Sequence, residues 1–353
     1  MQNYNCKLCG AELYWNAAAG CLKCEYCDSE YQVSDFEDST NTKTEVADES
    51  LDTNYVSEEL EDGMVAYECK KCSGTVITSK TTMAEICPYC GESISITSKS
   101  VGKFRPKFLI PFKIEKKDAK KIYSDYVSKA KYAPKEFKVD NVIEKMQGLY
   151  APFYLHTMDN RSSHIFEGEK TSVRTSGEYR ITKHDVYQLS AEIRGKYKNI
   201  PTDGSVRLDD NLLKWIEPYD YNEMKEYNPA YMSGFLAEQT DEDENKMNLA
   251  AEERSKNANR DKARSLFTSN YSSVSDKNSN YNITNHTKDY SMLPIWLLNV
   301  NHGDKKYQFA INGQTGKITG KLPLNYGKIA IINGIVFGVV DIIMAFLQMG
   351  GIF

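Results

Sequence analysis

Eight of the nine cysteines in the chain form two C-x2-C-x14-C-x2-C patterns, a spacing typical of metal binding. The first pattern consists of Cys6, Cys9, Cys24 and Cys27, and the second of Cys69, Cys72, Cys87 and Cys90. Each cysteine of the second pattern lies 63 positions after its counterpart, which indicates an internal duplication. Because two C-x2-C pairs can close a tetrahedral thiolate site, the sequence predicts two zinc ribbons, each with one structural Zn²⁺ ion.

Paired cysteines also occur in disulfide frameworks and in redox-active sites. A disulfide framework is typical of secreted chains, and Met1–Gly10 lacks the charged segment followed by an apolar segment of a signal peptide. A redox C-x2-C usually occurs singly, next to a βαβ pattern. Zinc therefore remains the favoured interpretation, and thiolate ligands indicate a reducing compartment.

The ninth cysteine leaves the ligand set of the first ribbon open to two pairings. Cys21 and Cys24 also form a C-x2-C, so spacing alone would permit Cys21 to bind the metal. The match to the second pattern favours Cys24 and Cys27 and leaves Cys21 outside the predicted site. Sites with four protein ligands hold structure and do not activate water, so neither ion is predicted to be catalytic.

The charge of the chain is distributed unevenly. The 353 residues have a formal net charge of −5, but residues 1–62 contain 15 acidic and 3 basic residues. That segment has a net charge of −12, which leaves +7 for the remainder. Phosphate contacts need Lys and Arg, so the acidic segment argues against a nucleic-acid-binding arm at this end of the chain.

Composition divides the chain into five predicted segments. Residues 34–63 are mostly Asp, Glu, Ser, Thr and Asn, a composition that cannot bury enough apolar surface to fold. The predicted segments are zinc ribbon 1 at 1–33, an acidic disordered linker at 34–63, zinc ribbon 2 at 64–98, an α+β core domain at 99–324 and a C-terminal transmembrane anchor at 325–353. The predicted fold class is a multidomain chain with two small four-cysteine zinc ribbons, an α+β core with an antiparallel sheet and one C-terminal transmembrane helix.

The elements of the core follow from apolar periodicity and turn signals. Tyr150–Tyr197 alternates apolar and polar residues between Asp-Asn, Glu-Gly and Ser-Gly turn signals, which predicts an antiparallel meander of short strands. Glu115–Lys131 has one apolar stripe, and Asp241–Phe267 has acidic residues in its first turn and basic residues near its end, so both are predicted helices. Ser205–Tyr219 and Asn222–Leu236 are predicted short helices.

Two stretches of the core resemble each other in their Pro, aromatic and Leu content. They are Leu149–Leu155 and Met292–Leu298, and each is predicted to start a strand. The likeness has two readings: coincidence, or a core built of two related halves.

No residue pattern in the chain predicts catalysis. The five histidines form no H-E-x2-H or other closely spaced metal pair. Gly313–Lys317 is similar to a phosphate-binding loop, but it lacks the first Gly of that motif, and Ile318 stands at the Ser/Thr position. We interpret this stretch as a hairpin turn and predict that the protein is not an enzyme.

Residues 329–347 form an apolar run with no basic residue and one acid. Nineteen helical residues span about 28 Å, close to the thickness of the hydrocarbon core of a bilayer. A buried core helix is the alternative. Lys317, Lys321 and Lys328 precede the run, and no basic residue follows it. The positive-inside rule then predicts a tail-anchored, single-pass protein of the cell membrane with its soluble bulk in the cytoplasm.

Small and acidic residues recur on one face of this predicted helix. They are Gly334, Gly338, Asp341 and Ala345, at spacings of four, three and four. Gly-x3-Gly allows close helix approach, and an acid within a span usually faces a partner. These residues are therefore a predicted helix–helix interface, either with a second copy or with another subunit.

The motifs together resemble the bacterial family of TFIIB-type zinc-ribbon membrane proteins, some of which are labelled as similar to the zinc region of the primosomal helicase. Besides the eight cysteines, the likeness rests on Ile110–Ile114, Gly148–Tyr154, Asn199–Asp203, Glu217–Tyr219, Pro229–Phe235, Leu293–Trp296 and Asn312–Lys317. The chain contains no motor motif, so the helicase label has no support here. The chain also differs from the family in showing one C-terminal apolar run where relatives often show two.

The resemblance implies zinc binding by the eight cysteines and anchoring in a membrane. In Bacillus-type relatives it also implies a role in envelope stress with phage-shock protein A, which such proteins help to bring to the membrane. We therefore expect a membrane-anchored adaptor on the cytoplasmic face, with the ribbons as docking heads for a protein partner. The alternative function is a membrane-tethered zinc-ribbon regulator that binds nucleic acid.

Overall fold

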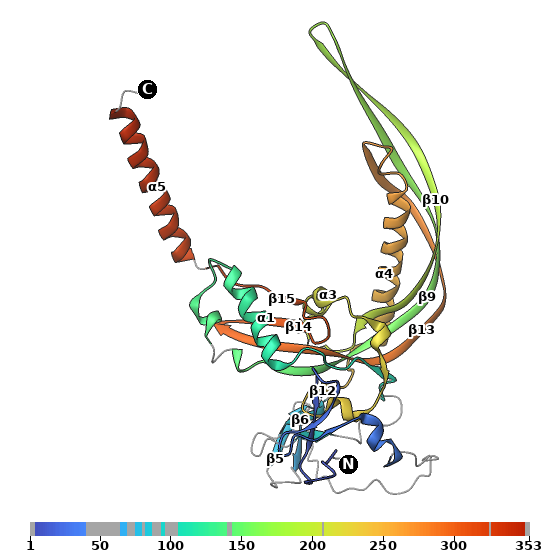
Figure 1. The fold of residues 1–353 in the computed structure, drawn as a ribbon. Helices are drawn as coiled ribbons and strands as arrows, with labels where there is room; N and C mark the ends of the chain where they lie inside the picture. The colour runs from blue at the N-terminus through green and yellow to red at the C-terminus, as the bar shows by residue number, and fades with distance from the viewer. Residues whose placement is uncertain are drawn as a thin grey trace.

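A computed structural model describes residues 4–39, 64–68, 75–79, 82–86, 93–95, 105–139, 143–206, 208–324 and 326–349. The described chain is mostly β, and it is organised around one ten-stranded sheet. The main path of this sheet has the order β11-β8-β13-β9-β12-β6-β7, with β10 paired to β9 and with β14 and β15 continuing from β13. Figure 1 shows that the long strands of the sheet curve upward into an arm.

Three long strands form the arm. They are β9 (Gln147–Ser176), β10 (Tyr179–Asp203) and β13 (Ser273–His302). Register shifts interrupt the pairing between Tyr197 and Ile200 on β10, and at two places on β13. Asn199 and Asn285 lie within two of these irregularities with positive φ, a conformation that Asn tolerates better than most residues. Such bulges increase local twist and bending, which accounts for the curvature of the arm.

Shorter strands complete this sheet and two smaller ones. Those in the main sheet are β6 (Thr82–Ile86), β7 (Ser93–Ser95), β8 (Phe108–Leu109), β11 (Lys225–Glu226), β12 (Leu236–Glu238), β14 (Lys305–Asn312) and β15 (Ile318–Gly320). The separate strands are β4 (Met64–Glu68) and β5 (Thr75–Ser79), which pair with each other, and β1 (Leu13–Asn16), β2 (Cys21–Cys24) and β3 (Glu30–Tyr31).

The helices lie beside the sheet or project from it. The α-helices are α1 (Lys116–Lys129), α3 (Asp210–Ile216), α4 (Glu244–Ser265) and α5 (Tyr326–Met349). The 3-10 helices are η1 (Val33–Ser39), η5 (Lys135–Lys138), η6 (Tyr221–Glu223) and η7 (Pro229–Met232). The predicted helix 115–131 corresponds to α1 and the predicted helix 241–267 to α4. The predicted helix 222–236 is instead broken into η6, β11, η7 and the start of β12.

The two similar stretches of sequence lie opposite each other in the sheet. Leu149 pairs with Ile295, and Leu155 pairs with Asp289, so the start of β9 runs antiparallel to the second half of β13. Each of these strands is then flanked by a short parallel strand, β12 beside β9 and β8 beside β13. This arrangement has the form of an approximate two-fold repeat and agrees with the interpretation of two related halves.

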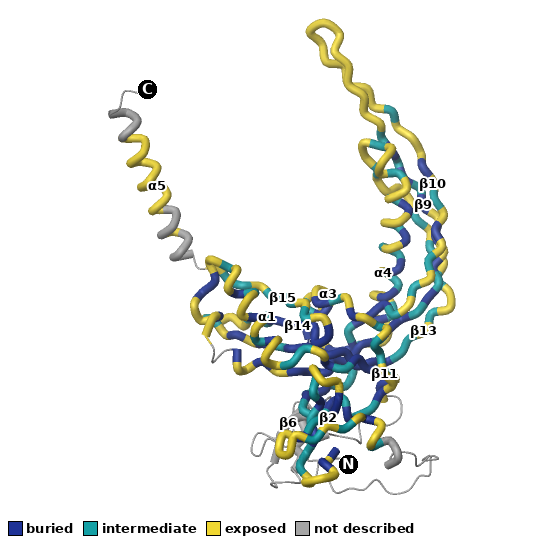
Figure 2. The backbone as a smooth tube through the Cα atoms, in the orientation of Figure 1, coloured by how far each residue is buried: buried dark blue, intermediate teal, exposed yellow. Residues whose placement is uncertain are grey.

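The buried core lies at the base of the arm, whereas the tip of the β9–β10 hairpin is exposed on both faces (Figure 2). Phe112 is at the centre of an aromatic cluster in this core. Its ring stacks on Phe235 with centroids 4.0 Å apart and makes edge contacts with Tyr150 and Trp296 at 5.1 and 5.2 Å. These rings come from four separated segments of the chain, so their packing holds the base of the fold together.

The structure corrects three predictions about the C-terminal region. Residues 326–349 form helix α5, which projects away from the sheet (Figure 1). Among the residues that the structure describes, no helix combines the length and the apolar character needed to cross a membrane. The predicted transmembrane anchor, the tail-anchored topology and the single-pass location in the cell membrane are therefore wrong. Those predictions relied on an apolar run of about the right length, and such a run does not by itself distinguish a span from a projecting helix.

The predicted segments of the N-terminal part lie only partly within the described residues. Val33–Ser39, at the border of the predicted acidic disordered linker, is the 3-10 helix η1. Its Phe36 makes edge contacts with Tyr4 and Tyr31. The remainder of that linker, from residue 40 to residue 63, lies outside the described residues. Strand β6 of the predicted second ribbon pairs with β12, so part of that region belongs to the main sheet.

Replacing Phe112 with Ala should destabilise the fold strongly. Its side chain is fully buried among three aromatic rings, and removing such a side chain costs about 3–5 kcal/mol in unfolding free energy. Tyr179→Ala is a matched control, because Tyr179 is 78% exposed at the tip of the arm and its removal should change stability by less than about 0.5 kcal/mol. Urea unfolding of the two variants measures the difference, and equal stability would contradict this description of the core.

The contribution of His156 to the stability should fall as the pH is lowered below about 6.5. Burial, together with the charges of His286 and Lys288, lowers the pKa of His156 from its usual 6.5 to about 4. The unfolded chain therefore takes up a proton at His156 before the folded chain does, so the contribution of His156 to the free energy of unfolding declines between these two pH values. His156→Gln should weaken this pH dependence in urea titrations, whereas His302→Gln, at a more exposed position, should preserve it.

Candidate metal centre

The first ribbon is built from three short strands and a tight turn. β1 and β2 pair from Leu13 opposite Cys24 to Asn16 opposite Cys21. The Asn16 side chain closes the turn between them, because its Oδ1 accepts hydrogen bonds from the backbone N–H groups of Ala18 and Ala19 at 3.0 and 2.9 Å. Gly20 ends the turn with a φ of 66°, a conformation that favours glycine. The hairpin therefore fixes the second cysteine pair relative to the first.

The two cysteine loops have the same backbone geometry. The residues four positions after Cys6 and Cys24 are Gly10 and Asp28, which donate to the carbonyl oxygens of those cysteines at 2.8 and 3.0 Å. Both have positive φ, 76° for Gly10 and 58° for Asp28. This repeated turn aims the two thiols of each C-x2-C in one direction. We call these two loops the knuckles.

The knuckles bring four thiol sulfurs together. The Sγ atoms of Cys6, Cys9, Cys24 and Cys27 all lie within 4.8 Å of one another. Cys6 and Cys27 are 3.4 Å apart, and Cys9 and Cys24 are 3.5 Å apart. Tetrahedral thiolate ligation with metal–sulfur bonds of about 2.3 Å requires sulfurs about 3.8 Å apart, so the four cysteines could hold one metal ion.

Cys21 lies outside this group. Its backbone pairs with Asn16 at the far end of the hairpin, and its side chain is buried. Burial is the main cause that raises the pKa of its thiol. The four clustered sulfurs thus include those of Cys24 and Cys27 but not that of Cys21. The match in spacing between the two cysteine patterns predicted this choice.

Two further side chains contact sulfurs of this group. The hydroxyl of Tyr31 lies 3.4 Å from the Sγ of Cys6, and the hydroxyl of Ser29 lies 3.1 Å from the Sγ of Cys27. The contact with Tyr31 is the largest cause that lowers the pKa of Cys6 to about 5. The sequence analysis did not identify these two residues, although their position directly after the second C-x2-C is a signal that could have indicated them.

The thiols cannot all ionise together without a cation. A backbone hydrogen bond at Ala11 lowers the pKa of Cys9, but burial and the sulfurs of the other three cysteines raise it to about 12. Without a cation, the thiol of Cys6 therefore ionises readily, whereas the thiol of Cys9 keeps its proton. A divalent cation at the centre would remove this conflict, because metal ions bind thiolates and release the protons.

The ribbon is packed against the base of the main sheet. The indole Nε1 of Trp15 donates to the carbonyl oxygen of Phe112 at 3.1 Å, and the backbone N–H of Trp15 donates to Ser233 at 3.2 Å. The Trp15 ring also contacts Tyr231 with centroids 4.8 Å apart. The first ribbon is thus fixed to the core, which differs from our expectation of docking heads on a tether.

The structure does not test the remaining predicted site residues. The cysteines of the second pattern lie outside the described residues, so that pattern stays a prediction. On α5, Gly334, Gly338, Asp341 and Ala345 are exposed, and nothing described lies within 4 Å of a Cβ built on either glycine. The helix–helix interface likewise stays a prediction.

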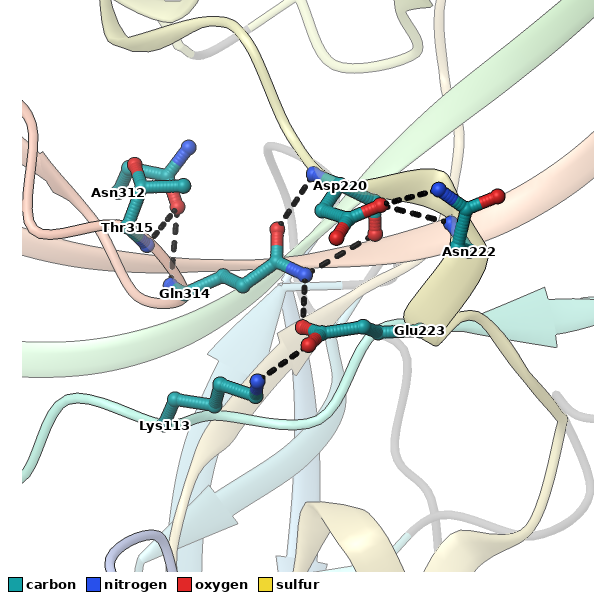
Figure 3. Close-up of polar contacts among 7 residues, drawn as sticks. All are labelled: Lys113, Asp220, Asn222, Glu223, Asn312, Gln314 and Thr315. Atoms are coloured by element: carbon teal, nitrogen blue, oxygen red, sulfur yellow. Dashed lines mark hydrogen bonds and ion pairs between the residues drawn. The ribbon is translucent and has the colours of Figure 1, made fainter.

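The stretch similar to a phosphate loop forms the turn between β14 and β15. Asn312 Oδ1 accepts from the backbone N–H groups of Gln314 and Thr315, which closes the turn. Gln314 then reaches Asp220 and Glu223, and Lys113 pairs with Glu223 (Figure 3). The turn is thus tied to the η6 region by polar side chains, and it has the structural role that the sequence predicted.

Replacing Cys27 with Ser should lower the metal content of the purified chain by about one ion, because one of four ligands is lost from a site with a tetrahedral arrangement. Cys21→Ser is the matched control and should leave the content unchanged, since Cys21 lies outside the group. Elemental analysis of the two variants tests the assignment. A loss of metal from the Cys21 variant, with none from the Cys27 variant, would reverse it.

Comparisons with known proteins leave the function of the chain open. No family model matches it, and no solved structure matches it. The chain is similar to the uncharacterized protein YdjG of Bacillus subtilis (strain 168), with 27% identity over 352 residues. The similarity covers 99% of this chain and 98% of that protein, so it extends through the cysteine patterns and the core.

Proposed function

We propose that the chain is a non-enzymatic zinc-binding protein that binds a protein partner through the knuckles of its first ribbon. The observation that carries this proposal is the exposure of two large apolar side chains, Leu8 at 79% and Tyr26 at 83%. Each stands between the two cysteines of one knuckle. Apolar side chains on loops held by a metal lose little further conformational freedom on binding, so they suit a docking surface.

Zinc is the metal that the ligand chemistry favours. Soft thiolates select zinc or iron–sulfur clusters over Mg²⁺ and Ca²⁺, and a single tetrahedral site with four protein ligands is the usual structural zinc site. The duplicated spacing supports a second zinc ion at Cys69, Cys72, Cys87 and Cys90. Both ions would be structural, because neither would keep an open position for water.

The resemblance to the TFIIB-type zinc-ribbon family supplies the partner in this proposal. It suggests phage-shock protein A, and the exposed knuckle residues supply a surface of suitable chemistry. The proposal does not include a membrane anchor, since the described residues offer no spanning helix. In this form the chain would hold its partner on a rigid surface next to the main sheet.

Nucleic-acid binding is less well supported by the charges of the ribbon. Lys7 donates to the backbone oxygen of Asp35 at 2.7 Å and lies over the ring of Phe36 at 4.9 Å. Lys23 pairs with Asp28 at 3.0 Å. Both lysines of the ribbon are therefore engaged within it, whereas phosphate binding needs cations that face outward.

The double variant Leu8→Ser, Tyr26→Ser should weaken binding to purified phage-shock protein A by at least about tenfold, because it removes two exposed apolar side chains from the centre of the proposed surface. Biolayer interferometry with the full chain measures the dissociation constant. Metal content should stay unchanged, since neither residue is a ligand.

The matched control replaces Leu249 with Ser. Leu249 is also highly exposed, at 64%, but it lies on α4 and away from the ribbon, so this variant should bind normally. Equal binding by all three proteins would refute the docking surface. Retention of the full chain on DNA at low salt, with loss of retention on Lys7→Gln, would favour the nucleic-acid alternative.

A further inference from the structure

A cavity of about 310 Å³ lies where the end of β10 meets α3 and α4. Part of its wall is apolar, with Phe153, Leu213 and Met247 among the lining residues. Ala250 also lines the cavity and is exposed, which places it at the mouth. A volume of this size, with apolar side chains on part of the wall and charged side chains on the rest, can accommodate a small amphiphilic ligand. The cavity is separate from the metal centre, because it shares no residue with the first ribbon.

One carboxyl group in this cavity has an unused oxygen. The Oδ1 atom of Asp203 accepts a hydrogen bond from the backbone N–H of Ser205 at 3.0 Å. Its Oδ2 atom is buried and has no hydrogen-bond partner within the described part of the chain. A buried polar atom without a partner is costly, so it indicates a position where a ligand group can bind.

Two of the three cations that line the cavity, Arg254 and Lys246, are already engaged in ion pairs. Arg254 binds Glu217 through both guanidinium N–H₂ groups and also donates to the carbonyl oxygen of Pro201 at 2.7 Å. Lys246 pairs with Glu242 at 2.5 Å and lies 3.7 Å from Asp210. Among the described residues, the carboxyl of Asp203 therefore has no ion-pair partner.

The whole lining carries more acids than bases. The charged residues are Asp203, Asp210, Glu217, Glu242 and Glu253 against Lys214, Lys246 and Arg254. Burial is the main cause that raises the pKa of Asp203 to about 8, and the charges of Asp210 and Glu242 act in the same direction. Burial thus keeps this carboxyl largely protonated at neutral pH, although the backbone N–H of Ser205 and the charge of Lys246 act in the opposite direction.

We propose that this cavity binds an aliphatic primary amine, with the ammonium group donating to Oδ2 of Asp203 and the carbon chain packed against Phe153, Leu213 and Met247. The ammonium group would provide the cation that Asp203 lacks, and the apolar wall would cover a chain of a few carbons. The amine is either a free small molecule or the side chain of a lysine. The chemistry of recognition is the same for both.

Two of the motifs noted in the sequence meet at this site. Asn199–Asp203 ends β10 and provides Pro201, Thr202 and Asp203, and Glu217–Tyr219 provides Glu217. Both motifs therefore contribute residues to the proposed ligand site.

The test is calorimetric titration of the full chain with 1,5-diaminopentane, and with 1,5-pentanediol as a neutral probe of the same length. The diamine should bind with a stoichiometry of about one, and the diol should not bind measurably, because only an ammonium group can form an ion pair with Asp203. Titration with a lysine derivative blocked at both backbone ends distinguishes the two sources. Binding of that derivative assigns the site to a lysine side chain, and binding of the diamine alone assigns it to a free amine.

Proton release provides a second readout that is specific to Asp203. The carboxyl must give up its proton to form the ion pair, so binding at pH 6.5 should release about one proton per amine, and binding at pH 9 should release almost none. Titrations in buffers of different ionisation enthalpy measure this number. The absence of proton release at pH 6.5 would overturn the role of Asp203.

Two variants and one control complete the design. Asp203→Asn keeps the acceptor for Ser205 and should weaken diamine binding by at least about tenfold. Ala250→Phe should block the mouth from an exposed position without disturbing the core. Asp185→Asn, which replaces an acid on the arm outside the cavity, should bind normally. Unchanged binding by both cavity variants, or the absence of saturable binding to the unmodified chain, would overturn the proposal.

Discussion

The antiparallel pairing of β9 with β13 is the constraint on which the rest of the structure depends. The two strands pair from Gln147 opposite Leu297 to Glu169 opposite Ser273, and every other strand of the main sheet attaches to one of them directly or through a neighbour. Strand β12 joins β9, and β6 joins β12, so the region of the second cysteine pattern depends on the same pairing. The first ribbon depends on it as well, because Trp15 binds the segments that immediately precede α1 and β12.

Polar side chains hold helix α4 against the strands of the arm, and the sequence did not indicate these contacts. Asn259 of α4 donates to the backbone oxygen of Asn160 and to Ser162 at 3.1 and 2.9 Å. It also accepts a hydrogen bond from Tyr197 at 2.7 Å. These side chains are largely buried, so each hydrogen bond replaces one lost to water and fixes the helix at one register on the sheet. The sequence predicted the helix from the distribution of its charges. Its packed face includes the polar residues Ser255 and Asn259, which a search for apolar periodicity does not find.

The features that the sequence predicted are local, and those that it did not predict join distant segments. The four cysteines of the first site lie within 22 residues, so their spacing alone indicates a shared ion. The meander of short strands was only partly right, because the Asp-Asn and Glu-Gly pairs taken as turns lie within continuous strands. Partner strands on both sides of β9 satisfy its backbone there, which single-sequence patterns cannot show. The contact of Trp15 with Phe112 joins residues 97 positions apart and has no local signature.

The position of Trp15 links the metal centre to the core and decides how the ribbon can function. Trp15 lies on β1, between the two knuckles in the sequence, and its backbone pairs with Leu22 on β2. Strand β1 therefore adjoins the cysteine loops. The indole ring of Trp15, on the same strand, contacts the segment that carries Phe112 and its aromatic cluster. A ribbon on a free tether would lose orientational entropy whenever it bound a partner. A ribbon fixed in this way has already lost that entropy during folding, so the core presents Leu8 and Tyr26 in one orientation relative to the sheet.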